Sequence, residues 1–356
     1  MVPFAGYEMP LQYAPGVFKE HVHTRAAAGL FDVSHMGQIV LRPRNGQVVD
    51  TALALETLVP MDIASLKPGR QRYALFTTET GAIADDLMVA NLGTHLLLVV
   101  NATCKESDEA HLRERLSNVC EVLMLPDRVL LALQGPQACA ALAALAPSVQ
   151  SMRFMDASTQ QIAGAACLVT RSGYTGEDGF EVSIPCDLAA SVVEQLLVNP
   201  HVELIGLGAR DSLRLEAGLC LYGNDIDLST SPVEAALEWA IQSSRRAQGS
   251  RSGGFPGAAA ILAQLERGAT RRRVGLRSES RPVRAGTQLF LSESSTTPVG
   301  NVTSGGFGPS VNGPVAMGYL PIRCSQAGMR LFADVRGNRV PVTVSDMPFI
   351  SHSYKR

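Results

Sequence analysis

Two neighbouring carboxylates in the sequence are of the type that acid–base chemistry needs. Asp85 and Asp86 follow a turn at Gly81 and open the apolar run 87–92. On a strand, successive side chains point to opposite faces, so one carboxylate can be solvated or structural while the other points inward. An inward carboxylate could accept hydrogen bonds, or a proton, from a bound molecule.

A third carboxylate lies inside an apolar strand. Glu181 falls between Phe180 and Val182, which share one face with Ile184. Because side chains alternate along a strand, Glu181 points to the other face. A solvent-facing carboxylate remains the alternative to a binding group at this position.

Arg210 belongs to a short, highly charged helix that we expect over 206–217. Within it, Asp211 and Arg214 are spaced as an i,i+3 ion pair. Gly218 stands where a C′ glycine would end the helix. Such a density of charge is unusual for a segment that only packs, although a solvated helix with an internal ion pair is the alternative.

One aromatic residue, Tyr354, stands almost at the end of the chain. Free tails are usually disordered, so an aromatic side chain here is a hint that the tail docks. From type and spacing alone, these groups define a candidate polar site with carboxylates, an arginine and aromatic rings. The sequence by itself does not show that they converge.

The elements that must position these groups alternate between strand pairs and helices. An extended, Pro- and Gly-broken arm over 1–20 comes first. The helices are expected over 17–29, part of 46–66, 103–118, 137–146, 187–198 and 206–217, and the strands over 30–43, 70–91 (a pair), 95–102, 128–134 and 167–185 (a pair). This order predicts an α+β fold with mostly antiparallel sheets and lacks a strict βαβ repeat.

The last third of the chain has a different composition. Residues 243–257 form a polar loop rich in Gly, Ser and Arg, which marks a domain boundary. A short helix is expected over 258–267. From 271 to the end, short strands and turns predict a small β-sandwich or barrel.

Composition excludes several classes of protein. The chain has 356 residues, 46% hydrophobic and 18% charged, which is enough for two or three domains and is typical of a soluble globular protein. The net charge of −2 gives no global basic excess for nucleic acid, and no apolar run reaches the ~18 residues of a membrane span. The start of the chain resembles no leader sequence. The seven cysteines contain no CxxC pair, so we expect buried, free thiols and no metal site.

Several local patterns that suggest chemistry are weak. Ser34 and His35 are adjacent, but no GxSxG elbow surrounds the serine. Gly206 and Gly208 begin a dinucleotide-like motif in which Asp211 occupies the place of the third glycine. His21 and His23 do not face the same way on a helix, so we expect solvated histidines and no metal pair.

Eleven segments in order along the chain resemble one family closely. They are FAGYEMPLQY, GLFDVSHMG, AIADDLMVANL, LALQGP, SGYTGEDGFEVS, ARDSLRLEAGLCLYGNDID, SPVE, RRRVGL, VTSGGFGPS, VAMGY and MPF. Together they resemble the glycine-cleavage T-protein (aminomethyltransferase) family from Val2 to the C-terminus, and its mitochondrial branch in particular. The chain begins about a dozen residues later than family members usually do, has Tyr7 in place of a more common Trp, and has a longer loop over 243–254.

The resemblance implies a three-domain cloverleaf with tetrahydrofolate in a central hole. The implied domains are 1–45 with 125–242 (folate-binding), 46–124 (ferredoxin-like), the loop and linking helix 243–270, and a C-terminal β domain, 271–356, of the barrel or jelly-roll type. The implied enzyme takes the aminomethyl group from the lipoylated H-protein, releases ammonia and forms 5,10-methylenetetrahydrofolate. The implied location is the mitochondrial matrix, or otherwise the cytoplasm.

The resemblance also implies roles for single residues. Asp86 matches the family's functional aspartate, and we expect it to orient the folate amine and hold the displaced proton. Met36, Glu181, Arg210 and Tyr354 match positions that contact folate, with a structural ion pair as the alternative for Arg210. The cluster Arg271, Arg272 and Arg273 could contact an acidic carrier protein, or be an ordinary solvated strand end.

Three other functions remain open at this stage. One is a folate-binding regulatory or repair module that lacks the transfer step and so has no need of Asp86 or a lipoyl carrier. Another is a demethylating relative fused to a flavin dehydrogenase, which the absence of an N-terminal dinucleotide domain disfavours. A nonenzymatic carrier-docking protein would account for the arginines but not for Glu181, Arg210 and Tyr354 together.

Overall fold

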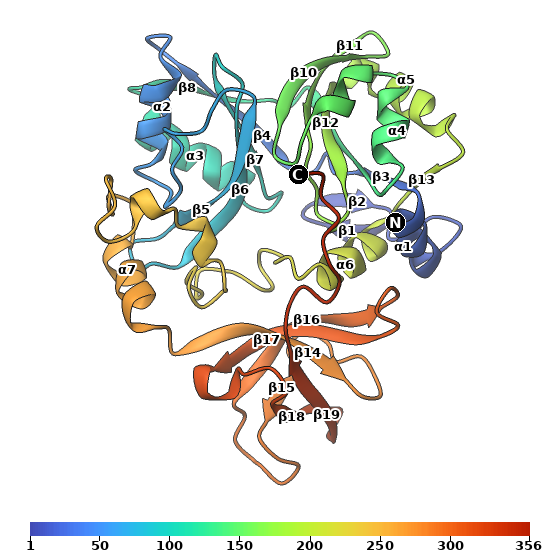
Figure 1. The fold of residues 1–356 in the computed structure, drawn as a ribbon, viewed down its shortest axis with the longest axis vertical. Helices are drawn as coiled ribbons and strands as arrows, with labels where there is room; N and C mark the ends of the chain where they lie inside the picture. Colours follow the sequence, from blue (N-terminus) through green and yellow to red (C-terminus); the bar gives the residue numbers. More distant parts are fainter.

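The fold has three lobes that meet around one short helix. The computed structural model describes all residues 1–356. Two lobes are α+β, and the third, at the bottom of Figure 1, is a β-barrel. All strand pairs but one are antiparallel, so the predicted α+β class and the predominance of antiparallel sheets are confirmed.

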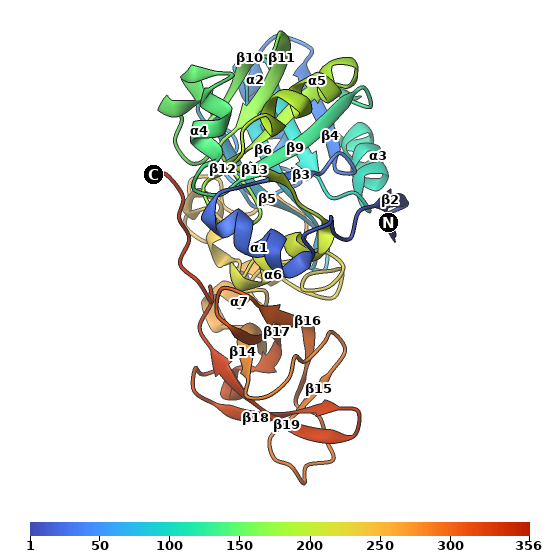
Figure 2. The ribbon, with the colours of Figure 1, turned by 90° about the vertical axis from the view of Figure 1, so that its right-hand side faces the viewer.

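The first lobe contains a six-stranded sheet in the order β10-β11-β12-β9-β3-β13. Its strands are β3 (Ala28–Asp32), β9 (Arg128–Gln134), β10 (Ala157–Ile162), β11 (Ala165–Thr170), β12 (Gly179–Pro185) and β13 (Val202–Leu204). Helices α4 (Ala138–Ala143) and α5 (Cys186–Leu197) cover one face and enclose a core of 22 buried residues. Helices α1 (Val17–Ala26) and α6 (Leu207–Glu216) pack together below this sheet (Figure 2).

The second lobe contains a five-stranded sheet in the order β5-β6-β7-β4-β8. Its strands are β4 (Gly37–Pro43), β5 (Arg70–Thr77), β6 (Ile83–Asn91), β7 (Leu96–Val100) and β8 (Cys120–Met124), with helices α2 (Val48–Leu55) and α3 (Lys105–Leu116) packed on them. Strand β4 ends two residues before the predicted boundary at 45, and β8 ends at the predicted boundary at 124. Because β4 pairs with β7 and β8, we propose that the first boundary falls before residue 37.

The third lobe is a closed barrel in the order β14-β17-β16-β15-β18-β19. Its strands are β14 (Arg271–Ser278), β15 (Gln288–Phe290), β16 (Gly300–Gly308), β17 (Gly313–Pro321), β18 (Arg330–Val335) and β19 (Asn338–Ser345), around twelve buried apolar residues. Helix α7 (Ala258–Arg267) precedes the barrel at the predicted position. Of the two predicted forms, sandwich and barrel, the chain adopts the barrel.

Helix α6 ends in the way its sequence predicts. Gly218 has a left-handed φ of 69°, and its N–H donates to the carbonyl of Leu215. The N–H of Leu219 donates to the carbonyl of Arg214, which completes a Schellman motif. The turn directs the following loop toward β16, so α6 joins the first lobe to the barrel.

Both ends of the chain are ordered, on opposite sides of the molecule (Figure 2). At the N-terminus, β1 (Val2–Phe4) and β2 (Tyr7–Met9) form a hairpin where the sequence predicted only an extended arm. At the C-terminus, the tail after β19 runs from the barrel past α6 to the upper lobes (Figure 1).

Two expectations about single side chains are wrong. His21 is fully buried, because its imidazole contacts Ser212, Glu216 and Ser310 where α1 and α6 meet the barrel. Cys186 is exposed at the start of α5, although the other cysteines are buried or half-buried. All seven thiols are free.

Candidate active site

Asp86 is the centre of the candidate site. It lies half-buried on β6, where the side-chain amide of Asn101 donates to its Oδ1 at 2.7 Å. The same Nδ2 donates to Oδ1 of Asp85 at 2.8 Å, so one amide from the end of β7 connects both carboxylates. Their strand carries a register irregularity beside Asp85, a feature that often redirects side chains next to functional sites.

The surroundings of Asp86 favour its protonated form. Burial raises the pKa of Asp86 to about 7, and the negative charge of Asp85 adds to the effect. Asn101 and the hydroxyl of Tyr73 oppose the shift by hydrogen bonding. A carboxyl group that titrates near neutral pH can take up and give back a proton under working conditions.

Aromatic side chains lie beside this carboxylate. Tyr73, on β5, is close enough to Asp86 that the carboxylate raises the pKa of the phenol, together with burial. The ring of Trp239 lies over Tyr73 with centroids 5.0 Å apart and remains 57% exposed. An aromatic path therefore leads from the protein surface to Asp86.

Glu181 and Arg210 form the second part of the site. Ser172 donates to Oε2 of Glu181 at 2.9 Å, and burial raises the pKa of this carboxyl group. Arg210 lies near enough to oppose that shift. The face of β12 that carries Glu181 is therefore covered by polar groups of the chain, which argues against the solvent-facing alternative.

The guanidinium of Arg210 has no carboxylate within ion-pair distance. It lies instead over the ring of Tyr174, 4.8 Å from the centroid, and burial lowers its pKa. The structural ion pair on α6 belongs to Arg214, which contacts Asp211 and Asp225. Because a half-buried arginine without a counter-ion is costly, Arg210 is available for an anionic or polar ligand.

Tyr174 links the two parts of the site. Its ring contacts Arg210, its hydroxyl donates to the carbonyl of Cys220, and Asp86 is among the charges that raise its pKa. The structure thus brings Asp86 and Arg210 close to one aromatic residue on the loop between β11 and β12, with Glu181 near Arg210.

Met36 borders this group from the loop between β3 and β4. It is half-buried against a cluster that includes Ala209 and Leu213 of α6. Its neighbour His35 is buried, and burial with the nearby charge of Arg210 lowers its pKa to about 4. A neutral imidazole with no aligned serine hydroxyl agrees with the rejection of a Ser–His nucleophile.

Tyr354 lies at some remove from this group. Its ring stacks on Phe154, with centroids 4.0 Å apart and planes within 4°. Backbone hydrogen bonds from Ser353 to Gly176 and from Phe154 to Lys355 hold the tail. The charges that affect its pKa belong to Arg25 and Glu177. The tail is docked, but no contact joins Tyr354 to Glu181 or Arg210.

The arginine cluster on β14 is largely engaged within the chain. Arg271 pairs with Glu234, and Arg272 pairs with Glu238. Arg273 is buried and donates to the carbonyls of Ala235 and Gly218. The expectation that Arg273 contacts a partner is therefore corrected, because its guanidinium already binds the chain's own backbone.

Comparisons with known proteins identify the family. Residues 1–245 match the GCVT N-terminal domain, and residues 271–350 match the glycine cleavage T-protein C-terminal barrel domain. The chain belongs to the glycine cleavage T-protein family. The predictions of this family and of an aminomethyltransferase are therefore confirmed.

Known members of the family match this chain over nearly its whole length. It is 44% identical to the human mitochondrial aminomethyltransferase over 99% of this chain and 87% of that protein. It is 40% identical to the mitochondrial aminomethyltransferase of Dictyostelium discoideum over 100% of this chain and 90% of that protein. The crystal structure of the glycine cleavage system aminomethyltransferase T from Bartonella henselae has a TM-score of 0.91 at 44% identity, covering 100% of this chain and 95% of that one.

Four residues of the candidate site could not be selected from the sequence: Tyr73, Asn101, Tyr174 and Trp239. Tyr174 stands within the segment SGYTGEDGFEVS, but its type alone gave no reason to select it. The others lie on separate strands or in a linker, so only the folded chain brings them to Asp86. For Trp239, the sequence held one signal: it is the only tryptophan of the chain, and no apolar repeat around it explains it as a core residue.

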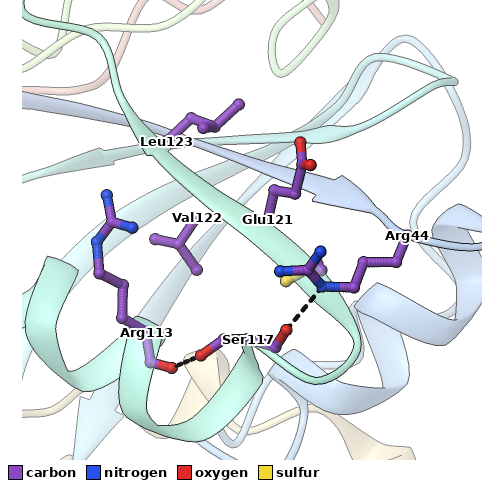
Figure 3. A pocket seen from close by; sticks show the side chains of 7 residues that line it. Arg44, Arg113, Ser117, Glu121, Val122 and Leu123 are labelled. Carbon is purple, nitrogen blue, oxygen red and sulfur yellow. Dashed lines mark hydrogen bonds between the residues drawn. The ribbon is translucent and has the colours of Figure 1, made fainter.

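A surface hollow lies outside the candidate site. It measures about 350 Å³ and is lined from α3, β8 and the residue after β4 by Arg44, Arg113, Ser117, Cys120, Glu121, Val122 and Leu123 (Figure 3). Nε of Arg44 donates to the carbonyl of Ser117 at 2.7 Å. Strands β7 and β4 separate this hollow from β6, so it is no part of the candidate site.

No helix is long and apolar enough to span a membrane. No group of three or more His, Cys, Asp or Glu side chains is arranged to hold a metal ion.

Proposed function

We propose that this chain transfers the methylene carbon of an aminomethyl group, carried on the lipoyl arm of an H-protein, to tetrahydrofolate. The C–S bond to the carrier and the C–N bond to ammonia break, and two C–N bonds to folate nitrogens form. The two hydrogens that the folate nitrogens lose end on ammonia and on the carrier thiol. The observation that carries this proposal is Asp86, a half-buried carboxyl group that titrates near neutral pH beside polar groups able to bind a pterin.

Asp86 acts in this proposal as the group that handles the proton. Its carboxylate orients the folate amine and takes the proton displaced when the amine attacks the carbon. A carboxylate in this place also stabilises the iminium-like carbon as positive charge develops. Both roles need the ionised form, so the transfer rate is expected to fall as the pH falls below about 7.

Glu181 and Arg210 bind tetrahydrofolate in this proposal. A pterin presents adjacent N–H donors at its edge, and one carboxylate can accept two of them. Glu181 lies near Arg210, and Ser172 donates to one of its oxygens at 2.9 Å. Arg210, which lacks an ion pair, donates to folate oxygen atoms. Met36 borders the same group of residues, and Tyr354, stacked on Phe154, orders the tail.

The variant Glu181→Gln tests this binding role. We expect the Kd for tetrahydrofolate to rise about 10- to 100-fold, because a charge-assisted hydrogen bond is worth about 1.5–3 kcal/mol. Isothermal titration calorimetry measures this directly. Glu203→Gln, an exposed carboxylate paired with His23, is the matched control and should leave the Kd unchanged. An unchanged Kd in Glu181→Gln would remove this residue from the binding site.

The single tryptophan offers a direct binding signal. Because Trp239 lies over Tyr73 and Tyr73 adjoins Asp86, we expect tetrahydrofolate to change the fluorescence of Trp239 by at least about a fifth on saturation. A fluorescence titration of the intact protein measures this change, and Trp239→Phe gives the background. Folate binding by calorimetry without any change in Trp239 emission would place the ligand away from this aromatic pair.

The names of the relatives support a proposal for the partner and the location. The curated relatives are named mitochondrial, and we propose that this chain also acts in the mitochondrial matrix. We propose the lipoylated H-protein as its partner, with the half-buried, ion-paired Arg271 and Arg272 as candidates for the contact. A folate-binding module without the transfer step is the second candidate. Transfer by the unmodified protein that is lost in Asp86→Asn would favour the transferase over this module.

A further inference from the structure

Asp85 has a second carboxyl neighbour besides Asp86, namely Asp108. Asp85, on β6, is completely buried, and Asp108, in the first turn of α3, is nearly so. The two carboxyl groups are within hydrogen-bonding reach of each other. Neither forms an ion pair with an arginine, lysine or histidine. Two buried carboxyls in contact without a cation can form a hydrogen bond only if one of them keeps its proton.

The contacts of the pair show which carboxyl group is ionised. Asp85 accepts two N–H bonds, from Nδ2 of Asn101 at 2.8 Å and from its backbone nitrogen at 3.2 Å. Hydrogen bonds of this kind stabilise a carboxylate. Oδ2 of Asp108 is buried and has no partner among ordinary donors. The proton therefore belongs on Asp108, and burial beside Asp85 raises the pKa of Asp108 to about 9.

The other groups around the pair are neutral at working pH. Cys104 and Tyr222 face Asp85, and burial raises the pKa of the Cys104 thiol to about 12 and also raises that of the Tyr222 phenol. Around Asp86, the facing groups are Tyr73, Tyr174 and Cys220, whose pKa values are also raised by burial. Asp85 is therefore the one fixed negative charge next to Asp86.

We propose that Asp108 is a positioning residue of the transfer site, whose protonated carboxyl group donates a hydrogen bond to Asp85 and so keeps one negative charge beside Asp86. Asn101 connects this charge to Asp86 through its two N–H bonds. The inference rests on the proposed function, because it concerns the basicity that Asp86 needs for transfer. Burial of Asp86 remains the larger cause of its raised pKa, and Asp108 acts only by keeping the charge on Asp85, the second cause.

Two asparagine variants test where the charge lies. Asp108→Asn keeps a neutral donor to Asp85, so we expect kcat within about threefold of the unmodified protein and an acid limb of the pH–rate profile that moves by less than about 0.3 units. Asp85→Asn removes the charge, so the acid limb should move down by about one unit or more. Asp108→Leu removes the donor and should lower kcat about tenfold or more. A kcat that is low in Asp108→Leu but near normal in Asp108→Asn is expected only if the hydrogen bond from residue 108 to Asp85 supports transfer.

The opposite pattern would overturn the proposal. If Asp108 carried the charge, Asp108→Asn would move the acid limb down as Asp85→Asn does. If both residues only supported the fold, each variant would lower kcat and the free energy of unfolding without moving the limb.

A measurement that does not depend on activity separates this proposal from the proposed function. With ¹³C-labelled aspartate carboxyl groups, the NMR resonance lost in Asp108→Asn should keep the shift of a protonated acid up to pH 8. A carboxylate shift for Asp108 at pH 7 would contradict the proposal even if the protein transfers methylene groups. A protonated shift in a protein without folate-dependent transfer would instead count against the proposed function alone.

Discussion

Replacing Asp86 with asparagine is expected to lower the rate of methylene transfer about 10³-fold. A positioned acid–base group typically contributes 10²- to 10⁴-fold, and in the proposed mechanism Asp86 also stabilises the positive charge that develops on the transferred carbon. The Kd for tetrahydrofolate should stay within about threefold, because Glu181 and Arg210 lie on other elements and remain in place. Single-turnover transfer and calorimetric binding, measured on the same protein, separate the two effects.

The control for this variant is Asp211→Asn on α6. Asp211 is 57% exposed, so its loss should leave both rate and binding unchanged. Equal loss of binding and transfer in Asp86→Asn would contradict the division of roles between Asp86 and the folate-binding residues.

The same variant is expected to be more stable than the unmodified protein above pH 7. The folded-state pKa of Asp86 is raised from 3.8 to about 7, so its ionised form is disfavoured in the folded state. That cost develops as the pH rises from about 4 to 7 and is absent below both values. Asp86→Asn should therefore raise the free energy of unfolding by about 4 kcal/mol at pH 8 and by less than about 1 kcal/mol at pH 4. Urea unfolding at both pH values measures the difference.

Replacing Arg214 with methionine is expected to produce the largest loss of stability, about 3–5 kcal/mol. Arg214 is buried and donates to Asp225 at 2.7 Å, and Asp225 is fully buried. Methionine fills much of the volume but leaves Asp225 without its cation. Nη2 of Arg214 also donates to Ser304 of β16, so the variant weakens the contact between α6 and the barrel. The urea midpoint at pH 7 should fall accordingly.

The matched control is Asp211→Ala, which removes the exposed partner of the same arginine. Exposed ion pairs contribute at most about 1 kcal/mol, so this variant should lie within that range of the unmodified protein. If Arg214→Met were no less stable than Asp211→Ala, the buried Arg214–Asp225 pair would not hold the barrel against α6.

Much of the fold could be predicted because local signals agreed with it. Gly218 ends α6 by the expected motif, α7 spans 258–267, and the strand pair over 70–91 forms β5 and β6. Strand β8 was not predicted, because no glycine or proline separates it from the helix that precedes it. His21 was placed in solvent because a sequence shows spacing on a helix, but not that α6 and the barrel close over it.

The site could be predicted only in part. Matching segments marked Asp86, Glu181 and Arg210, which the structure brings together. Tyr354 carried the same kind of match but stacks on Phe154 at the edge of the tail. Alternation along β6 suggested that Asp85 and Asp86 act apart, whereas Asn101, fifteen residues further on, joins them. Contacts between distant strands leave no trace in local spacing.

The most direct test of the central claim is ammonia release from aminomethylated lipoyl H-protein, with and without tetrahydrofolate. We predict that tetrahydrofolate accelerates release by at least about 100-fold and that one equivalent of 5,10-methylenetetrahydrofolate forms per ammonia. Release at the same slow rate with and without tetrahydrofolate, in a protein shown by calorimetry to bind it, would contradict the account and favour a folate-binding module without the transfer step.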